Sequence, residues 1–541
     1  MKQEPNYRLA TSQPDHIMVS ISGDAKSSMS ITWRTCADIK DGYVEYYEKG
    51  NEKLTQSAIT EVFESDINTS HIHFAMLKGL KPGTRYYYTV GSSDIRSDEY
   101  YFETEEENLT HFKFVCISDH QKDNDHYNPD YSILNGFLKK VFKENPDIKF
   151  IFTAGDNTNN GQHEIQWNAM YDGLKGIIEY RPYMMTLGNH DNRGFKQYFP
   201  VEKDRYYAEP AVFFNTQHKY SYPLNGPEGW QTENYAFNYG NCQFLVYSVN
   251  EPVLVNEWAL DKIKTSDKTW QFGAYHFPIY YAGPNLSNDD GYPMMRESVE
   301  SLDVMFSGHE HGFSRTFPIK NEEMFDKPSQ GTIHYELGNG HRNPPGTKML
   351  SKIWHSAFYA HEEKLCSCAI VEVNGNKITI TSMLEDGRIF DECVIDKDKD
   401  EILPHAIAPV FGEGRTRMIY KGMDPGLCCY ELPCIYENNI WYVPFGTLVS
   451  FIGGDTVREK GKMTTTVYGK TAVFTDESDI AVTNNGEVKL DGNVKRFCQN
   501  QLYVPLDSAC KIFGMKWAYA KHNNFITIES ANESHPVPTQ P

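Results

Sequence analysis

The chain has 541 residues, of which 40% are hydrophobic and 23% are charged, and its formal net charge is −21 at pH 7. This length exceeds a single hydrophobic core, so we expect several domains. The negative charge argues against a nucleic-acid surface, but not against a phosphorylated small molecule, because a local metal pair can reverse the sign of the potential. No apolar stretch approaches the roughly 20 residues of a membrane span.

The N-terminus and the cysteines leave the cellular compartment open. The first residues, Met1 to Pro5, are polar and lack the apolar segment of a secretory leader. Either the protein stays inside the cell or a leader has been removed. The 11 cysteines are an odd number spread along the chain. They do not form the dense framework of a disulfide-stapled domain, so we expect reduced structural thiols.

The first hundred residues are rich in short β-type segments separated by Gly, Asp and Lys turns. The predicted strands include residues 17–21, 29–33, 43–47 and 86–90. Strands at this spacing predict a small β-sandwich. The acidic run from Glu103 to Glu107 marks its end, so we place this domain at residues 1–107.

From Phe112 onward, apolar strands alternate with helix-like stretches. The predicted strands are residues 112–117, 149–153, 183–187, 271–274 and 304–306. Residues 130–142 carry apolar side chains at helical spacing, and the alternation of strands with helices indicates an α/β core. Antiparallel-type strands close this block, which we place at residues 108–400; they are residues 368–373, 377–381 and 391–395.

An internal repeat organises the last domain, residues 401–530. Tyr442-Val-Pro-Phe recurs 61 residues later as Tyr503-Val-Pro-Leu, and each copy continues into a helix-like segment and then a strand. A repeated strand–turn–helix unit predicts a small α+β structural or binding module rather than a second active site. The tail at residues 531–541 is polar and ends in proline, so we expect it to be disordered.

Five polar stretches each follow an apolar run in the α/β block. They are Ser118-Asp-His-Gln121, Gly155-Asp-Asn-Thr-Asn-Asn-Gly161, Gly188-Asn-His-Asp191, Tyr275-His276 and Gly308-His-Glu-His311. Residues at the carboxyl ends of strands in an α/β sheet face the crevice where ligands bind. The Asp, Asn and His side chains of these stretches are the hard and borderline donors that divalent cations need. The ordered set therefore predicts a dinuclear metal centre.

The residue types suggest a division of roles within this centre. Asp156 is placed to share its carboxylate between two cations, and Asn189 offers an amide oxygen. His309 and His311 can present imidazoles to two different metals. Cations held about 3.5–4 Å apart lower the pKa of a shared water and stabilise an in-line displacement at phosphorus. His190 is not needed as a ligand if Asn189 is one, and it would point toward the leaving group and either donate a proton or hold a phosphoryl oxygen.

Other residues near the motifs are expected to support the site, although each also has an ordinary structural explanation. We expect Asp191 to orient His190, and Asn157 to Asn160 to support the ligands from outside. Taken singly, the stretches at Asp119, Asp156 and Asn189 are also typical of ordinary turns or loops, and His276 is also typical of a packed core histidine. Gly-His-x-His is the most specific single element, and the joint order of all five favours a metal site. His341 and Arg342 lie in a loop that either reaches a phosphate or is merely solvated.

These residues resemble the calcineurin-like metallophosphoesterases, and among them the purple acid phosphatase-like branch. The likeness rests on Gly-Asp, Gly-Asn-His-Asp, the single His and Gly-His-x-His, and it covers residues 112–395. Gly79-Leu-Lys-Pro-Gly-Thr-Arg-Tyr-Tyr-Tyr is similar to the fibronectin type III-like domain that precedes the catalytic domain in that branch. The C-terminal repeat is similar to the copper amine oxidase N-terminal-like (stalk) domain. The implied fold is multidomain, and its metallophosphoesterase part is a two-sheet β core flanked by helices.

The resemblance also implies how the ligands are divided between two divalent metal ions. The first metal takes Asp119 and His311, the second takes Asn189, His276 and His309, and Asp156 bridges both. Purple members carry a tyrosine three residues after the bridging aspartate, and here that position is Asn159. A purple Fe(III)–tyrosinate centre is therefore not supported, and Mn²⁺, Zn²⁺, Fe²⁺ or Mg²⁺ remain open.

Two further positions depart from the family pattern. Gln121 stands where other members have a histidine, which predicts a weaker hold on the first metal. Asn285, Asn288 and Asp289 stand where plant and animal relatives place further substrate histidines, which leaves the substrate open.

The leading hypothesis is an acid phosphatase-like enzyme that hydrolyses phosphate mono- or diesters of small molecules with a metal-bridging hydroxide. The alternative, prompted by Gln121 and Asn159, is a surface or cell-wall binding protein whose metallophosphoesterase fold has lost activity. In a third hypothesis, the C-terminal domain contacts glycan or cell wall. The absence of a leader favours the cytoplasm, whereas the stalk-like domain favours an extracellular location.

Overall fold

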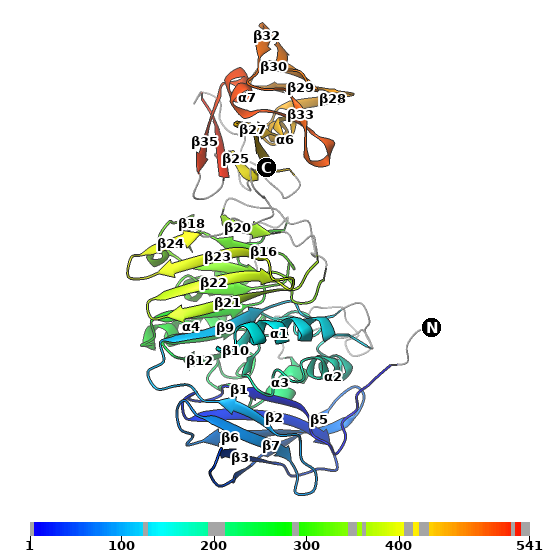
Figure 1. The fold of residues 1–541 in the computed structure, drawn as a ribbon, viewed down its shortest axis with the longest axis vertical. Helices are drawn as coiled ribbons and strands as arrows, with labels where there is room; N and C mark the ends of the chain where they lie inside the picture. The colour runs from blue at the N-terminus through cyan, green and yellow to red at the C-terminus, as the bar shows by residue number, and fades with distance from the viewer. Residues whose placement is uncertain are drawn as a thin grey trace. The chain divides into compact units, whose positions relative to one another are not determined.

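A computed structural model describes residues 5–122, 128–192, 211–283, 291–343, 354–359, 364–404, 415–420, 432–520 and 525–531 (Figure 1). The chain divides into two compact units. The first comprises residues 1–281, 287–346 and 361–405, and the second comprises residues 282–286, 347–360 and 406–541. Among the described residues, no helix is long and apolar enough to cross a membrane.

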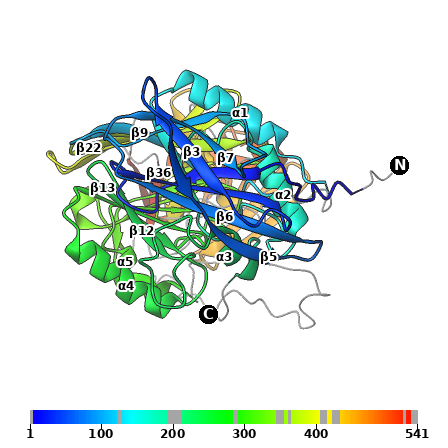
Figure 2. The same ribbon diagram turned by 90° about the horizontal axis from the view of Figure 1, so that it is seen from below.

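The N-terminal domain is the predicted β-sandwich, made of two four-stranded antiparallel sheets (Figure 2). One sheet has the spatial order β1 (Asp15–Ser20), β2 (Ser28–Cys36), β6 (Thr69–Lys78) and β5 (Ile59–Glu64). The other has the order β4 (Leu54–Ser57), β3 (Tyr43–Glu48), β7 (Arg85–Gly91) and β8 (Tyr100–Glu103). Alternate residues of facing strands, such as Trp33 and Tyr88, are buried in one shared core, as the period-2 pattern predicts.

The α/β block contains two larger mixed sheets. The first has the order β11 (Tyr183–Met184), β10 (Ile148–Thr153), β9 (His111–Ile117), β21 (Ser367–Asn374), β22 (Lys377–Leu384), β23 (Ile389–Asp396) and β24 (Glu401–Pro404). The second includes, in order, β12 (Tyr235–Tyr239), β13 (Cys242–Tyr247), β14 (Trp270–Tyr275), β15 (Val304–Ser307), β19 (Ile333–Leu337) and β16 (Phe313–Thr316). A small hairpin joins β17 (Ile319–Lys320) to β18 (Glu323–Met324), and η1 (Pro328–Gln330) follows it.

Phenylalanine rings fill the space between these two sheets. Phe114 of β9 stacks on Phe150 of β10 at 5.1 Å and meets Phe244 of β13 edge-on at 5.1 Å. Helices α1 (Ser132–Glu144) and α2 (Glu164–Gly173) lie to one side of the sheets, and α4 (Pro252–Thr265) and α5 (Tyr292–Val299) lie to the other (Figure 2). Helix α3 (Val212–His218) also belongs to this block. The predicted α/β core is thus confirmed.

One predicted strand is shorter than expected. The run at 183–187 pairs with β10 only at Tyr183 and Met184. Thr186 leaves the ladder because its N–H donates to the Thr153 hydroxyl (3.1 Å) and its carbonyl accepts the Asn157 amide (2.9 Å). These side-chain bonds replace the sheet bonds and begin the loop that carries the third motif.

The second unit contains the repeat. Its larger sheet has the order β33 (Lys495–Arg496), β34 (Leu502–Pro505), β27 (Ile440–Val443), β26 (Cys434–Glu437), β25 (Arg415–Tyr420), β36 (Phe525–Ser530) and β35 (Met515–Ala520). Its smaller sheet runs β28 (Asp455–Glu459), β29 (Lys462–Val467), β30 (Lys470–Thr475), β31 (Ile480–Thr483) and β32 (Gly486–Lys489). The remaining elements are α6 (Phe445–Phe451), α7 (Leu506–Phe513), η2 (Cys498–Asn500) and β20 (His355–Tyr359).

The two copies of the repeat share a strand–helix–hairpin order but differ in pairing. In the first copy β27 leads to α6 and the β28–β29 hairpin, and in the second β34 leads to α7 and the β35–β36 hairpin. The hairpins belong to different sheets, whereas Phe445 and Phe513 of the two helices stack at 4.9 Å in one core. The tail expected to be disordered lies outside the described residues, except for Ala531. The nine described cysteines are all free thiols.

The sandwich is packed against the α/β block within the first unit. The Val19 N–H donates to the Ile178 carbonyl (2.9 Å), and the Tyr88 hydroxyl donates to the Glu179 carbonyl (2.6 Å). An apolar cluster joins β5 and β6 to the segment of α3, with Phe63, Ile72, Phe74, Phe213 and Tyr220. These direct contacts fix the sandwich on the block rather than leaving it tethered by a linker.

Glu105 lies at the junction between the sandwich and the block and is only 4% exposed. Its N–H donates to the Ala25 carbonyl (2.9 Å), and its carboxylate accepts the Gly240 N–H. Burial raises the pKa of this carboxyl from 4.5 to about 7. The folded protein therefore keeps a proton that the unfolded chain releases, and this group's contribution to stability is lost as pH rises from about 4.5 to about 7.

We therefore expect Glu105→Gln to leave Tm nearly unchanged at pH 4 and to raise it by about 2–5 °C at pH 8. The reason is that the amide still accepts the Gly240 N–H but carries no buried charge. Thermal unfolding at both pH values measures this difference. Glu106→Gln is the matched control, since Glu106 is exposed beside Lys149. Equal Tm shifts for Glu105→Gln at pH 4 and pH 8 would contradict the expectation.

Candidate metal centre

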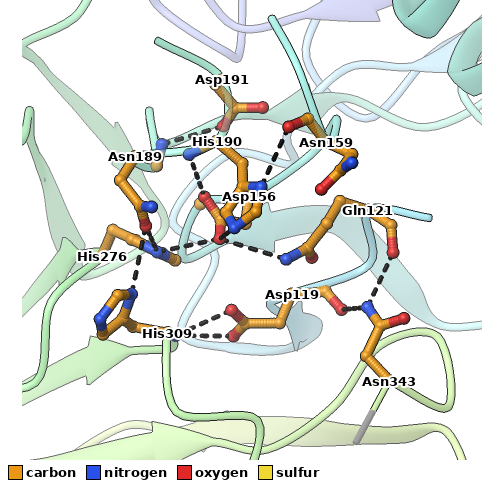
Figure 3. A network of polar contacts seen from close by, with 12 residues as sticks. Asp119, Gln121, Asp156, Asn159, Asn189, His190, Asp191, His276, His309 and Asn343 are labelled. Carbon is orange, nitrogen blue, oxygen red and sulfur yellow. Dashed lines mark hydrogen bonds and ion pairs between the residues drawn. The ribbon is translucent and has the colours of Figure 1, made fainter. Parts of the chain in front are cut away.

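All five polar stretches lie at the carboxyl ends of strands or just beyond them. Strands β9, β10 and β11 are parallel neighbours in the first sheet, and β14 and β15 are parallel neighbours in the second. Parallel strands end at the same edge of their sheet, so the loops that follow them converge. Figure 3 shows the side chains of these loops pointing toward one another.

Four of the predicted ligands have an unusual backbone. Asp119, Asp156, His309 and His311 have φ values of 51°, 53°, 77° and 59°, in the left-handed region that non-glycine residues rarely adopt. Such conformations persist only where the surrounding structure determines them, and they are frequent at functional sites. The local chain is therefore shaped to aim these four side chains rather than to extend the strands.

Two motif glycines allow the loops to approach closely. A Cβ atom at Gly308 would overlap the Ser118 hydroxyl and the Asp119 carboxylate. A Cβ atom at Gly188 would overlap the backbone nitrogen and the carboxylate of Asp156. Neither glycine has a positive φ, so it is the lack of space for a side chain that requires glycine at both positions.

The first cluster of side chains surrounds the carboxylate of Asp156. His276 donates from Nδ1 to the Ala154 carbonyl (2.9 Å), so its Nε2 faces inward. That Nε2 lies 3.2 Å from Asp156 Oδ2 and 2.9 Å from Asn189 Oδ1. His309 Nδ1 lies 3.1 Å from the same Asn189 oxygen. Four side chains from four loops therefore present oxygen and nitrogen atoms that can ligate a metal to one small volume.

The second cluster surrounds the carboxylate of Asp119. Both of its oxygens accept the His309 N–H, at 2.8 and 2.9 Å, and Oδ1 lies 3.6 Å from His311 Nε2. Gln121 links the clusters, with its Nε2 3.2 Å from Asp156 Oδ2 and 3.4 Å from His311 Nε2. Its Oε1 is buried without a partner, and a half-turn of the amide would present this oxygen to the centre instead.

The donor set fits a divalent cation. One ligand atom each from Asp119, Asp156 and His276 lies within 4.8 Å of the others, and all three residues are buried. Among the described residues, only histidines form ion pairs with these two carboxylates. Burying carboxylates without a compensating cation is costly, and oxygen and imidazole donors are those that Mn²⁺, Zn²⁺ and Fe²⁺ accept.

The pKa values also indicate that the buried carboxylates require a positive charge beside them. Burial raises the pKa of Asp119, whereas His276 and His190 overcome the effect of burial at Asp156 and lower its pKa. Burial alone would lower the pKa of His276, but Asp156 and Asp119 raise it to about 9. Without another cation, an imidazolium thus supplies the positive charge that the carboxylates require.

His190 lies beside the clusters and is more accessible to solvent. Its N–H donates to Asp156 Oδ1 (2.9 Å), and its Nδ1 donates to the Asn159 carbonyl (3.0 Å). Its Nε2 then faces the centre, 3.9 Å from Asp156 Oδ2. The side chain is 19% exposed, compared with 0% for His276, so it can meet a bound molecule from the solvent side.

Asp191 does not orient His190 as the sequence suggested. Its buried carboxylate accepts the Gly188 N–H (2.9 Å), the Asn157 N–H and amide, and the Thr158 N–H and hydroxyl. It therefore ties the second motif loop to the third, and the Asn159 carbonyl sets the His190 ring instead. Burial and the nearby Asp156 raise the pKa of Asp191 to about 6.

Three protein families match the chain by sequence. The purple acid phosphatase N-terminal domain matches residues 14–104, and the calcineurin-like phosphoesterase domain matches residues 112–313, which contain every motif loop described above. The chain carries a calcineurin-like phosphoesterase domain. The copper amine oxidase N-terminal domain matches residues 429–528. The predicted resemblance is confirmed for all three regions.

Plant purple acid phosphatases are among the proteins that this chain resembles in sequence. The chain is 24% identical over 438 residues to "Probable inactive purple acid phosphatase 1" of Arabidopsis thaliana, covering 71% of this chain and 70% of that protein. It is 22% identical over 356 residues to "Purple acid phosphatase 18" of the same plant, covering 62% and 74%. The names of these relatives thus include an enzyme and a protein described as probably inactive.

A solved purple acid phosphatase shares the fold. The structure of the enzyme PPD1 from yellow lupin (Lupinus luteus) superposes with a TM-score of 0.59 at 18% identity, covering 72% of this chain and 75% of that one. At this identity the likeness establishes the architecture of the sandwich and the phosphoesterase domain, and the chemistry has to be argued from the residues present.

The sequence did not identify the loop that supports the first motif of the phosphoesterase domain. The Asn343 amide donates to the Gln121 carbonyl (2.8 Å), and the Gly340 N–H donates to the Ser118 carbonyl (2.9 Å). Asn339 accepts the Asn343 N–H (3.0 Å) and so closes this loop on itself. The glycines and asparagines of the run Gly338-Asn-Gly-His-Arg-Asn343 are the sequence signal for this loop, whereas the prediction rested only on its two basic residues.

Those basic residues have other partners. His341 donates from Nε2 to the Asp130 carbonyl, and Arg342 forms an ion pair with Glu385. Neither contact belongs to the two clusters. Asn285, Asn288 and Asp289, at the positions of substrate histidines in relatives, lie outside the described residues.

Proposed function

We propose that this protein is a dinuclear metal-dependent phosphohydrolase that cleaves phosphate mono- or diesters of small molecules. The observation that carries the proposal is the buried meeting of Asp119, Asp156 and His276, with Asn189 and His309 in contact with them. The membership of these residues in a calcineurin-like phosphoesterase domain supports the same reaction class.

The two clusters would hold two divalent ions. Asp119 and His311 would bind one ion, Asn189, His276 and His309 the other, and Asp156 both. Bound there, such a pair supplies a water of lowered pKa and neutralises charge on the phosphoryl oxygens. Asn159 replaces the tyrosine of purple members, so the ions we propose are Mn²⁺, Zn²⁺, Fe²⁺ or Mg²⁺ rather than an Fe(III)–tyrosinate pair.

His190 would act on the leaving group. Its Nδ1–H is held by the Asn159 carbonyl, so its Nε2 is the ring atom that would donate a hydrogen bond or proton to the departing oxygen. The hydrogen bond from its backbone N–H to Asp156 holds the His190 backbone beside the proposed bridging carboxylate. Proton donation at this position stabilises an alkoxide or phenolate as the ester bond breaks.

The second candidate function is a binding protein that retains this fold without turnover. Gln121 favours it, because the amide lies against both Asp156 and His311 where the family places a histidine. The name "Probable inactive purple acid phosphatase 1" shows that relatives without expected activity exist. The two candidates differ in metal content and in turnover.

Reconstitution distinguishes them. The metal-free protein is incubated separately with Mn²⁺, Zn²⁺, Fe²⁺ and Mg²⁺, and bound metal is measured by elemental analysis. Phosphate release is then followed with phenyl phosphate as the monoester, and 4-nitrophenolate release with bis(4-nitrophenyl) phosphate as the diester. We expect about two ions per chain together with turnover of at least one ester class. A protein that binds no ion and hydrolyses neither ester would be the binding protein instead.

A further inference from the structure

The N-terminal sandwich supplies the cap of a helix in the phosphoesterase domain. Helix α2 begins at Glu164, and the preceding residue, His163, makes no side-chain cap of its own. Asp66, in the loop between β5 and β6, takes this role: its Oδ1 accepts the Glu164 N–H (2.8 Å), and its Oδ2 lies 3.0 Å from His163 Nδ1. An aspartate at this position satisfies a helix N–H and complements the positive end of the helix dipole.

Buried charged side chains connect the sandwich to the start of α2. Glu164 pairs with Arg34 of β2, and the side chains are 0% and 1% exposed. Arg34 is held in turn by both oxygens of Asp15, at 2.8 and 2.7 Å. Ser65, next to Asp66, donates to the other oxygen of Glu164. A buried, fully bonded network of this kind tolerates little displacement of α2 relative to the sandwich.

The first turn of α2 holds the loop after Asp156. Three hydrogen bonds join them: Trp167 Nε1–H to the Gly161 carbonyl (2.7 Å), the His163 N–H to the Asn160 carbonyl (3.1 Å), and the Asn159 N–H to Gln166 Oε1 (3.3 Å). The position of α2 therefore determines the position of this loop.

The same loop holds His190 at two points. The Asn159 carbonyl accepts Nδ1–H of the ring (3.0 Å), as Figure 3 shows, and the Gly161 N–H donates to the His190 carbonyl (2.9 Å). A continuous series of contacts thus runs from Asp66 through α2 and residues 159–161 to the imidazole. Because each of these contacts is a hydrogen bond with a preferred direction, a shift of the first turn of α2 would move the His190 imidazole.

We propose that Asp66 is a positioning residue for His190, through which the sandwich sets the aim of the imidazole at the leaving group. The role of His190 in this statement rests on the proposed phosphohydrolase function. The sandwich then contributes to the chemistry without touching the substrate, because it fixes the helix start from which the loop is held.

The test compares leaving groups. 4-Nitrophenolate departs with little proton donation, whereas phenolate depends on it, and a general acid contributes about 10²–10⁴-fold. We expect Asp66→Ala to leave kcat for 4-nitrophenyl phosphate within about twofold and to lower kcat for phenyl phosphate about tenfold or more. Asp66→Asn retains an acceptor for the Glu164 N–H and should recover most of the loss. In a His190→Ala background, Asp66→Ala should cause no further loss with phenyl phosphate.

The matched control is Thr32→Val, which removes another buried contact of the sandwich, Thr32 Oγ1 to Ser221 Oγ (2.9 Å), away from α2. It should leave the ratio of the two kcat values unchanged. An equal loss with both substrates in Asp66→Ala, or no loss with either, would overturn the proposal, because a merely structural residue affects both esters alike.

Hydrogen-exchange mass spectrometry separates this inference from the proposed function. We expect Asp66→Ala to accelerate amide exchange in residues 159–161 by about tenfold, and Thr32→Val to leave it unchanged. If the wild-type protein hydrolyses no ester but exchange accelerates, the coupling stands and the phosphohydrolase proposal fails. If exchange in this loop is unaffected by Asp66→Ala, the coupling itself is refuted.

Discussion

Asp156→Asn should lower phosphate release from phenyl phosphate by at least about 10³-fold and reduce bound metal to one ion per chain or fewer. The carboxylate contacts His276, Gln121 and the His190 backbone at once, so the neutral amide removes the charge common to both proposed cation positions. The amide keeps the side-chain shape, which separates loss of charge from loss of packing. Elemental analysis and initial rates after reconstitution measure the two effects.

His309→Ala tests the same centre through a ligand that follows β15 in the second sheet. It removes the imidazole that lies 3.1 Å from Asn189, and a comparable loss of turnover is expected. Asp172→Asn and His111→Ala are suitable controls, because both native side chains are largely exposed and lie outside the two clusters. Near-wild-type turnover in either Asp156→Asn or His309→Ala would refute the proposed centre.

Asp191→Ala should have the second-largest effect, on stability and on metal affinity together. The buried carboxylate accepts five hydrogen bonds from Gly188, Asn157 and Thr158, and each donor left unsatisfied costs about 1–3 kcal/mol. We expect a fall of about 3–5 kcal/mol in the free energy of unfolding and of about 10–100-fold in metal affinity, since the loops that carry Asp156 and Asn189 lose their common support.

Denaturant unfolding and metal titration of the same preparation check this expectation. Asp267→Ala, at a side chain that is 91% exposed, provides the control for removal of an aspartate. An Asp191→Ala protein with wild-type stability and metal affinity would show that the two motif loops hold their positions independently.

The sequence predicted the convergence of the motifs because the physical rule behind it is local. Apolar runs marked strands, parallel strands end at one edge, and the polar residues after each run had to meet there. This rule places His276 and His309, 33 residues apart in the chain, in the same site. Metal-donor chemistry then supplied the expected role of each side chain.

The supporting contacts were not predictable from the sequence, because they depend on tertiary partners. Nothing local to Asp191 indicates that it accepts from residues 157 and 158, and nothing near Asp66 indicates a helix start almost a hundred residues later. Helix α2 itself escaped prediction for a related reason. Its residues Glu164 to Tyr171 are all buried, the polar ones included, so polar and apolar side chains do not separate into a solvent face and a core face as they do in a recognisable amphipathic helix.

The left-handed backbone at Asp119, Asp156, His309 and His311 restricts how this centre could be re-engineered. Among side chains that bind metals, asparagine, aspartate and histidine tolerate this conformation best, whereas β-branched residues fit it poorly. Exchanges within that small group could change ion preference while the loops keep their path. Threonine at any of these four sites would incur steric strain in addition to altered coordination, so variant libraries there can omit it from the start.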